Sequence, residues 1–116
     1  MRYLLLIYGD EKADASATKE QQDAVMGEYL AYGDAMEKAG IMQGGEALHP
    51  TAAATTVRVQ NGKKVTTHGP FAETKEQLGG YYLLNCKNLD EAIEWAAKCP
   101  GARVGSIEVR PIMEFN

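Results

Sequence analysis

The stretch that decides the fold runs over residues 68–84 and reads HGPFAETKEQLGGYYLL. Its backbone is broken at Gly69 and Pro70, and it returns to a strand through Gly79 and Gly80. Loops tolerate almost any polar sequence, whereas here residues with special backbone properties flank a dense set of titratable groups. The stretch therefore predicts a turn between two strands that has a role beyond connecting them.

Length and composition indicate one globular domain over residues 1–116, with 45% hydrophobic and 24% charged residues. The net charge is −4, and the lysines and arginines are scattered along the chain. A surface that follows a nucleic-acid backbone needs these cations clustered. No apolar run approaches the length of a membrane span. We therefore expect neither nucleic acid nor a membrane as a partner.

The two cysteines and the first residues bear on the cellular compartment. Residues 2–8 form an apolar run that is too short for a signal peptide and is followed by charged residues. Cys86 and Cys99 fall near an expected strand end and an expected helix end. Without a secretion signal to imply an oxidising compartment, we interpret both as reduced, mostly buried thiols in a cytoplasmic protein.

Hydrophobic periodicity predicts alternating strands and helices. Residues 2–8 are apolar on both faces and read as a central strand. Thr18 and Gln21 form a capping box for a helix over residues 19–39, which Gly40 ends. Asn61-Gly62 favours a type I′ turn between two alternating strands. The other expected elements are a short strand within residues 41–50, the hairpin strands 55–60 and 63–67, a strand at 81–85, a helix from about residue 88 to Pro100 and a last strand at 105–110.

This order of elements predicts an α+β fold of ferredoxin-like type, with two split βαβ units and an inserted β-hairpin. Right-handed crossovers place both helices on one face of the sheet. Residues 2–8 and 81–84 are apolar on both sides, so the second face would expose a large apolar surface. A second copy of the chain is the simplest cover, and we expect a homodimer.

Residues 69–76, Gly-Pro-Phe-Ala-Glu-Thr-Lys-Glu, resemble the signature of the DGPF branch of the YCII-related family. That signature begins with Asp, where this chain has His68. Further segments similar to the family, in the same order along the chain, are residues 8–11, 45–48, 56–59, 90–96 and 107–111. The resemblance implies a dimeric α/β barrel, in which two such sheets pack face to face. It also implies binding or conversion of a small molecule at the barrel pocket, and some family members are encoded beside sigma-factor genes.

The densest titratable set surrounds the central stretch, and other polar residues are expected at the same cavity edge. The candidate catalytic residues are His68, Glu73 and Glu46, and the candidate ligand-binding residues are Lys75, Arg110, His49 and Tyr82, with Tyr81 as the alternative to Tyr82. Imidazole titrates near neutral pH, so His68 is suited to act as a general base that a carboxylate orients. Lys75 or Arg110 would hold an anionic ligand. The alternative is a turn whose charges pin two strands.

Metal and cofactor chemistry have weaker support. His49, His68 and Glu46 would supply two histidines and a carboxylate, but no short metal-ligand spacing occurs among them. No phosphate loop or dinucleotide fingerprint is present, so we expect no cofactor. Two functions remain: a cofactor-independent acid/base enzyme, or a non-catalytic regulatory module that reports a small ligand to the transcription machinery.

Overall fold

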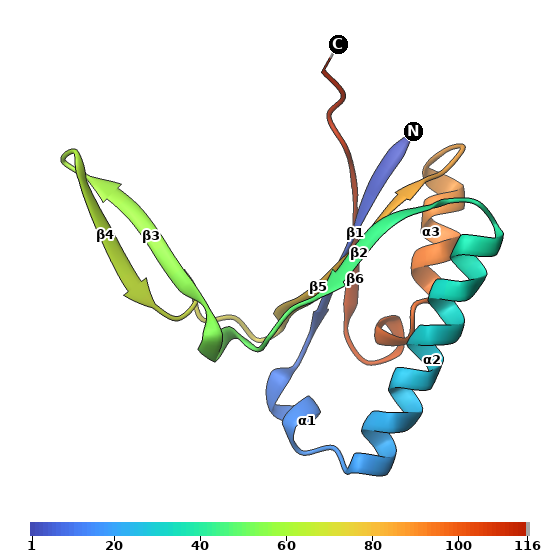
Figure 1. Ribbon diagram of the computed structural model, residues 1–116, viewed down its shortest axis with the longest axis horizontal. Coiled ribbons are helices and arrows are strands. Elements are labelled where there is room, and N and C mark those ends of the chain that lie inside the picture. The colour runs from blue at the N-terminus through green and yellow to red at the C-terminus, as the bar shows by residue number, and fades with distance from the viewer. Residues whose placement is uncertain (116) are drawn as a thin grey trace.

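One antiparallel sheet of four strands forms the centre of the molecule in the computed structural model, which describes residues 1–115 (Figure 1). The strands lie in the order β2-β5-β1-β6. Their bounds are Arg2–Gly9 for β1, Met42–Ala47 for β2, Gln77–Asn85 for β5 and Ser106–Pro111 for β6. Helices α2 (Lys19–Lys38) and α3 (Leu89–Lys98) lie on the same side of this sheet. The ferredoxin-like α+β fold expected from the sequence is therefore confirmed.

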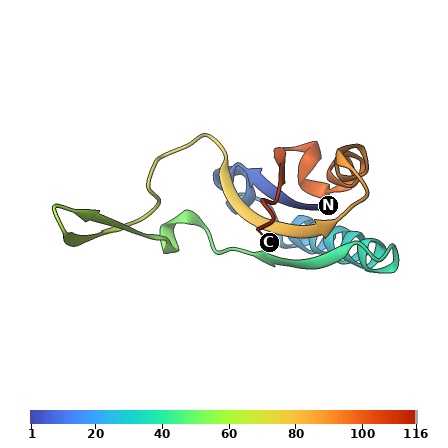
Figure 2. The same ribbon diagram turned by 90° about the horizontal axis from the view of Figure 1, so that it is seen from above.

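The inserted hairpin stands apart from the sheet. Strands β3 (Thr55–Gln60) and β4 (Lys63–His68) pair only with each other. Asn61 and Gly62 have φ values of 51° and 76°, as the expected type I′ turn requires. Figures 1 and 2 show that this hairpin, which we call the arm (residues 55–68), projects away from the body of the molecule. One linker, residues 48–54 with the 3₁₀ turn Thr51–Ala53, leads into the arm, and residues 69–76 lead out of it.

The hydrophobic core lies between the sheet and the two helices. It is built from buried side chains of both layers, chiefly Tyr3, Leu5, Tyr32, Met36, Ile41, Leu84, Ala92 and Ala96. Both helices begin where the sequence indicates. Thr18 and Gln21 form the expected capping box, and Asn88 caps α3 by accepting a hydrogen bond from the Glu91 N–H at 3.0 Å.

The cysteines are both free and buried, as expected from the sequence. Cys86 follows β5, and Cys99 follows α3. Burial raises the pKa of the Cys86 thiol, and the nearby Glu91 carboxylate raises it further. Both thiols are small buried core groups, and at Cys86 the raised pKa disfavours the nucleophilic thiolate.

Two helical features differ from the expectation. Residues 9–17, between the expected first strand and the expected first helix, contain a short helix, α1 (Glu11–Ala15), because Asp10 caps it and accepts hydrogen bonds from the N–H groups of Lys12 and Ala13. One turn is too short to show a hydrophobic period. In α2 the helical period predicts an apolar stripe of Val25, Tyr29, Tyr32 and Met36, with Met26 and Leu30 beside it, yet Met26 and Leu30 are 60% and 69% exposed. Figure 1 shows the first turns of α2 beyond the end of the sheet, near α1.

Strand β5 starts earlier than the predicted strand at residues 81–85, because the glycine pair lies inside it. A register shift against β1 falls between the pairs Ile7–Gly80 and Tyr8–Leu78. A Cβ on Gly80 would lie 2.9 Å from the Glu46 carbonyl oxygen of the neighbouring strand β2. The glycine pair therefore marks a bulge and a close approach of two backbones.

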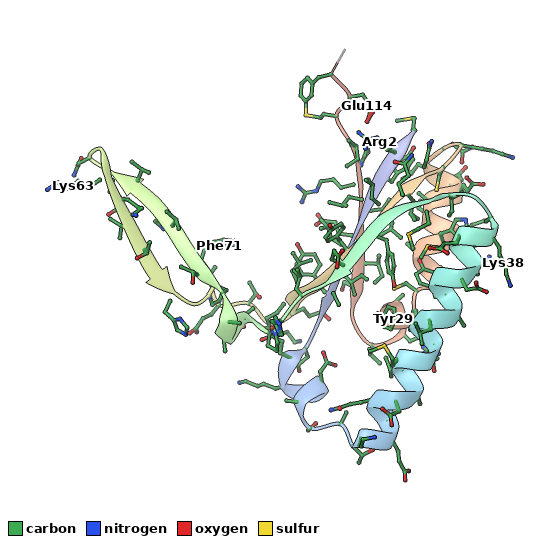
Figure 3. All side chains as sticks on the ribbon, in the orientation of Figure 1. Arg2, Tyr29, Lys38, Lys63, Phe71 and Glu114 are labelled. Carbon is green, nitrogen blue, oxygen red and sulfur yellow. The ribbon has the colours of Figure 1, made fainter. Side chains whose placement is uncertain are left out.

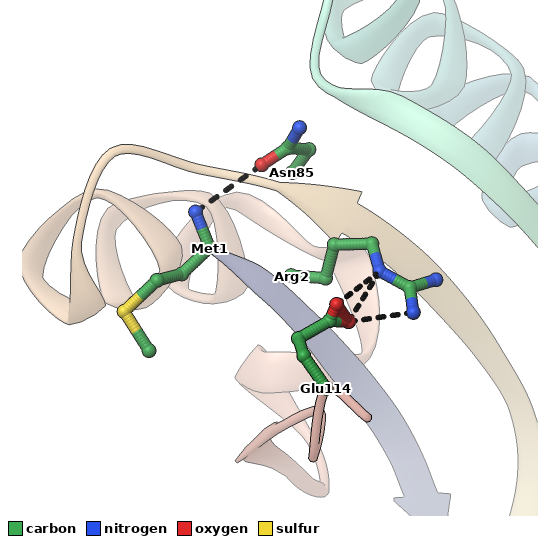
Figure 4. A network of polar contacts seen from close by, with 4 residues as sticks. All are labelled: Met1, Arg2, Asn85 and Glu114. Atoms are coloured by element: carbon green, nitrogen blue, oxygen red, sulfur yellow. Dashed lines mark hydrogen bonds and ion pairs between the residues drawn. The ribbon is translucent and has the colours of Figure 1, made fainter. Parts of the chain in front are cut away.

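The two ends of the chain are tied to the same end of the sheet (Figure 4). The N-terminal ammonium donates to the Cys86 carbonyl oxygen at 2.9 Å and to Asn85 Oδ1 at 3.3 Å. Arg2 Nε donates to Glu114 Oε1 at 2.8 Å, and Arg2 Nη2 lies 2.6 Å from the same oxygen. This bidentate pair holds the residues after β6 against β1, and the hydrogen bond and charge of Glu114 raise the pKa of Arg2.

Candidate functional site

The side of the sheet opposite α2 and α3 carries large apolar side chains that no described element covers. We call it the open face, and it consists of Leu4, Leu6 and Tyr8 from β1 and Leu78, Tyr81 and Leu83 from β5. Strand alternation explains the set, because the intervening residues of both strands face the helices. The register pairs these residues across the two central strands. All six are partly exposed, and none is buried.

Polar side chains border the open face on both edge strands. Glu46 of β2 lies opposite Tyr81, while Glu108 and Arg110 of β6 lie opposite Leu6 and Leu4. Neighbouring strands lie about 4.8 Å apart, so the edge strands are separated by about 14 Å. The sequence analysis expected Glu46 and Arg110 at the same cavity edge. They lie on the same face of the sheet but on its opposite rims, and they do not meet within one chain.

Arg110 is held in place at its rim. Its Nη2 donates to Glu108 Oε2 at 3.0 Å, and this hydrogen bond and the carboxylate charge raise the pKa of Arg110. The guanidinium carries five N–H donors, so one such bond leaves others for an anion. Arg110 is therefore a permanently charged group with free N–H donors beside an apolar surface.

Tyr82 and Tyr81 lie on opposite sides of the sheet. Tyr82 faces the helices, where its ring packs edge-to-face on Tyr32 with the ring centroids 5.4 Å apart. Burial raises the pKa of the Tyr82 hydroxyl, and it borders a shallow hollow with Tyr29 and Leu30 of α2. In one chain Tyr82 therefore does not share a cavity with Glu46. Tyr81, the alternative, lies beside Glu46 on the open face.

The remaining candidates lie on the arm and its linkers. His68 ends β4 opposite Thr55, His49 lies in the linker that follows β2, and Glu73 and Lys75 lie in the linker that follows the arm. All four side chains are exposed. Within residues 1–115 no hydrogen bond or ion pair joins any two of these four residues. In the same part of the chain no three His, Cys, Asp or Glu side chains gather closely enough to hold a metal ion.

A polar junction that the sequence analysis missed holds both linkers to the end of the sheet. The carboxylate of Glu11 in α1 accepts hydrogen bonds from Thr51 N and Thr51 Oγ1, both at 2.7 Å. The Glu11 N–H donates to Gln77 Oε1 at 3.0 Å. Ser106 Oγ donates to Glu76 Oε1 at 2.8 Å. Part of the charged stretch therefore connects strands, as the structural alternative predicts, through the contact of Glu76 with Ser106 of β6.

These features define a ferredoxin-like α+β domain with one face of its sheet covered by helices, the other open, and a projecting arm. The chain belongs to the YCII-related domain family, which it matches over residues 1–116. It is also 41% identical over 118 aligned residues to an uncharacterised protein of Rhizobium meliloti (strain 1021), with 100% of this chain and 95% of that protein covered. No helix in residues 1–115 is both long and apolar enough to cross a membrane.

Proposed function

We propose that the protein is a cytoplasmic homodimer of the DGPF branch, in which two open faces pack together as a dimeric α/β barrel and a small anionic ligand binds between them. The observation that carries this proposal is the open face itself. Six large apolar side chains on two central strands remain partly exposed in a single chain. Such a contiguous apolar patch is characteristic of an interaction surface.

The size of the exposed surface supports a dimer. The chain exposes 8483 Å² and has a mass of 12.6 kDa, whereas a compact monomer of that mass exposes about 6,200 Å². The excess of about 2,300 Å² matches what one subunit of an obligate homodimer buries. The radius of gyration is 16.2 Å, against about 13 Å for a compact domain of this length. The chain has the surface of a subunit rather than of a complete globule.

The ligand site follows from the geometry of such a dimer. Two facing sheets pack about 10 Å apart, whereas the two edge strands of one sheet are about 14 Å apart. A rim of one open face therefore lies closer to a rim of the partner's open face than to the other rim of its own sheet. Arg110 supplies a fixed positive charge, and Glu46 supplies a carboxylate on the same apolar surface. The exposed residues His68, Glu73 and Lys75 lie outside the chain's own open face and reach a shared pocket only across the dimer. The ligand is therefore small, anionic and partly apolar.

The two candidate functions differ in whether His68 transfers a proton. A histidine general base is oriented by a hydrogen bond to a carboxylate or a similar group. Within the described residues, His68 makes no such bond. The alternative to acid/base catalysis is ligand binding without turnover. In that case the dimer reports the ligand to a partner such as the transcription machinery. The two are separated by incubating the protein with each ligand found and looking for a product.

The test is a thermal-shift screen of small carboxylates and phosphates, followed by calorimetry on each hit. We expect a hit to bind the wild-type dimer and to bind Arg110→Ala at least tenfold more weakly, because a charge-assisted anion contact is lost. Arg103→Ala is the matched control. Arg103 is likewise exposed and paired with a glutamate, Glu28, but lies on the helix side. Equal binding by Arg110→Ala and wild type would refute the proposed site.

A further inference from the structure

Among residues 1–115, the strands of the arm pair only with each other and have no other surface to pack on. An isolated two-stranded hairpin is marginally stable in water and needs another surface to pack on. Every residue of the arm is exposed except Thr56, which is partly buried. Val57 and Val59 are 57% and 72% exposed, although both belong to a regular strand. These valines share one face of the hairpin with Lys64 and Thr66, which lie opposite them in the register.

The arm is positively charged in an acidic protein. Arg58, Lys63 and Lys64 are its only charged side chains apart from His68, and it contains no carboxylate. The whole chain has a net charge of −4, so the rest of the molecule is strongly negative. The face of the arm that carries Val57 and Val59 also carries one of these cations, Lys64, so it fits a partner surface that combines apolar residues with carboxylates.

Helix α2 presents a surface of that kind. Its outer side exposes Met26 and Leu30, at 60% and 69%. The helix carries five carboxylates and two lysines. Along it, Leu30, Asp34 and Glu37 border the shallow hollow that reaches Tyr82. The surface formed by Met26, Leu30, Asp34 and Glu37, which we call the α2 surface, is thus apolar with an acidic edge.

The arm and the α2 surface do not meet within one chain. Figure 1 shows the arm and α2 on opposite sides of the sheet. Figure 3 places Lys63 at the tip of the arm, far from Tyr29 and Lys38 on α2. Two complementary surfaces that one chain keeps apart can meet only between copies. In a two-fold dimer each arm would then contact the partner's helix reciprocally.

We propose that the arm of one chain docks on the α2 surface of a second copy, with Val57 and Val59 against Met26 and Leu30. This inference rests on the homodimer of the proposed function. The reach is sufficient, because the partner's helices lie about two layers, or about 20 Å, from the first sheet. A strand of the length of β3 spans about 20 Å and the linkers extend it further. Docking fixes His68, at the base of the arm, relative to the partner subunit.

Disulfide cross-linking tests the contact directly. The native cysteines are buried, so cysteines introduced at exposed positions react selectively. In the double variant Val59→Cys/Leu30→Cys we expect most of the chain to form a covalent dimer under mild oxidation, as seen on a non-reducing gel. Val65→Cys/Leu30→Cys is the matched control, because Val65 lies on the opposite face of the arm. It and both single variants should stay mainly uncrosslinked.

A charge exchange provides a second test that does not depend on cysteine. Lys64→Glu faces the acidic α2 surface of the partner, so we expect it to raise the dimer dissociation constant roughly tenfold through like-charge repulsion. Glu37→Lys should act similarly, and the double variant should recover most of the affinity. Sedimentation equilibrium measures the dimer dissociation constant of each of these three variants.

The outcomes separate this inference from the proposed function. A dimer that forms in solution but shows no Val59–Leu30 cross-link beyond the Val65 control overturns the docking of the arm and leaves the dimeric pocket standing. A protein that remains monomeric at high micromolar concentration overturns both. Selective cross-linking together with rescue by the charge exchange supports the docking.

Discussion

Gly80 determines how closely the central strand β5 approaches the edge strand β2. A Cβ at Gly80 would lie 2.9 Å from the Glu46 carbonyl oxygen, whereas a Cβ at Gly79 would meet only the Ile7 carbonyl oxygen at 3.9 Å. The two glycines are adjacent in sequence, but only the second lies where β2 and β5 approach closely. Because β2 carries Glu46, this contact also positions a candidate ligand group.

We expect Gly80→Ala to lower the free energy of unfolding by about 1–3 kcal/mol, because the added methyl group forces the two strands apart. Gly79→Ala is the control and should change it by less than about 1 kcal/mol, since that position has room. Urea denaturation followed by circular dichroism measures both. Equal effects of the two substitutions would contradict the close approach.

Tyr32 makes stability depend on alkaline pH. Its hydroxyl donates to the Trp95 carbonyl oxygen at 2.7 Å, and burial raises its pKa above the usual value of a tyrosine. In the unfolded chain the tyrosine loses its proton near pH 10. The folded state holds the proton longer, so this contribution to stability is complete below about pH 10 and is lost as the pH rises above it.

The predicted outcome is a free energy of unfolding that falls steeply from pH 9.5 to pH 11 in the wild type and less steeply in Tyr32→Phe. Phenylalanine fills nearly the same volume but does not titrate, so the difference between the two slopes isolates the hydroxyl. Urea titrations at a series of pH values measure this. Parallel slopes would show that Tyr32 ionises normally in the fold.

At the scale of elements, the arm is attached to the rest of the molecule mainly through its base. Its base is closed by the Gly69 N–H, which donates to the Ala54 carbonyl oxygen at 2.7 Å, and by Thr56 Oγ1, which donates to the Gly69 carbonyl oxygen at 2.8 Å. Beyond the base, the linker before the arm is fixed by the contact of Glu11 with Thr51. The direction of the arm therefore depends on α1, an element far from it in sequence.

We predict that Glu11→Ala loosens the arm more than it destabilises the domain. The substitution removes both hydrogen bonds to Thr51, so residues 48–54 should exchange their amide protons at least tenfold faster. Exchange in β1 and β5 should change little. Lys12→Ala, one residue away and exposed, is the control. Hydrogen exchange read by mass spectrometry resolves the linker from the sheet, and uniform protection in both variants would exclude this role for Glu11.

At the scale of the whole molecule, the protein has two unequal sides. The helix side buries a continuous core, while the other side exposes the open face and the arm. Phe71, in the linker after the arm, is 78% exposed and adds to the apolar surface there. Each of these surfaces is costly for a monomer in water, and all are explained if the working unit is two chains.

Leu6→Asp is expected to dissociate the dimer. The side chain lies in the middle of the open face but is partly exposed in one chain, so a carboxylate there is tolerated by the monomer and excluded from a dry interface. Ile93→Asp is the control, because Ile93 is an exposed apolar residue of α3, on the helix side. Light scattering at micromolar concentration should report one chain mass for the first variant and two for the second. Circular dichroism checks that both are folded, and a folded dimer of Leu6→Asp would count against the face-to-face arrangement.

The sequence alone was sufficient for the six strands, the two long helices, their order and the two-sided apolar character of the central strands, although not for α1 or the start of β5. Those features depend on local signals, namely the alternation in residues 2–8, the Thr18–Gln21 capping box, the Asn61-Gly62 turn and the Asn88 cap. Strand alternation and topology determine the face of the sheet on which Glu46 and Arg110 lie, but they do not bring the two residues to the one cavity edge that the sequence analysis expected.

Only the tertiary structure decided which of these residues meet. It separates Glu46 from Arg110 by the full width of the sheet, turns Tyr82 toward Tyr32, and carries His68 away from the sheet on the arm. It also brings Glu11 to Thr51 across 40 positions of sequence. Such contacts depend on strand register and on the path of the linkers. Packing among segments distant in sequence determines both, so no local periodicity of the sequence predicts them.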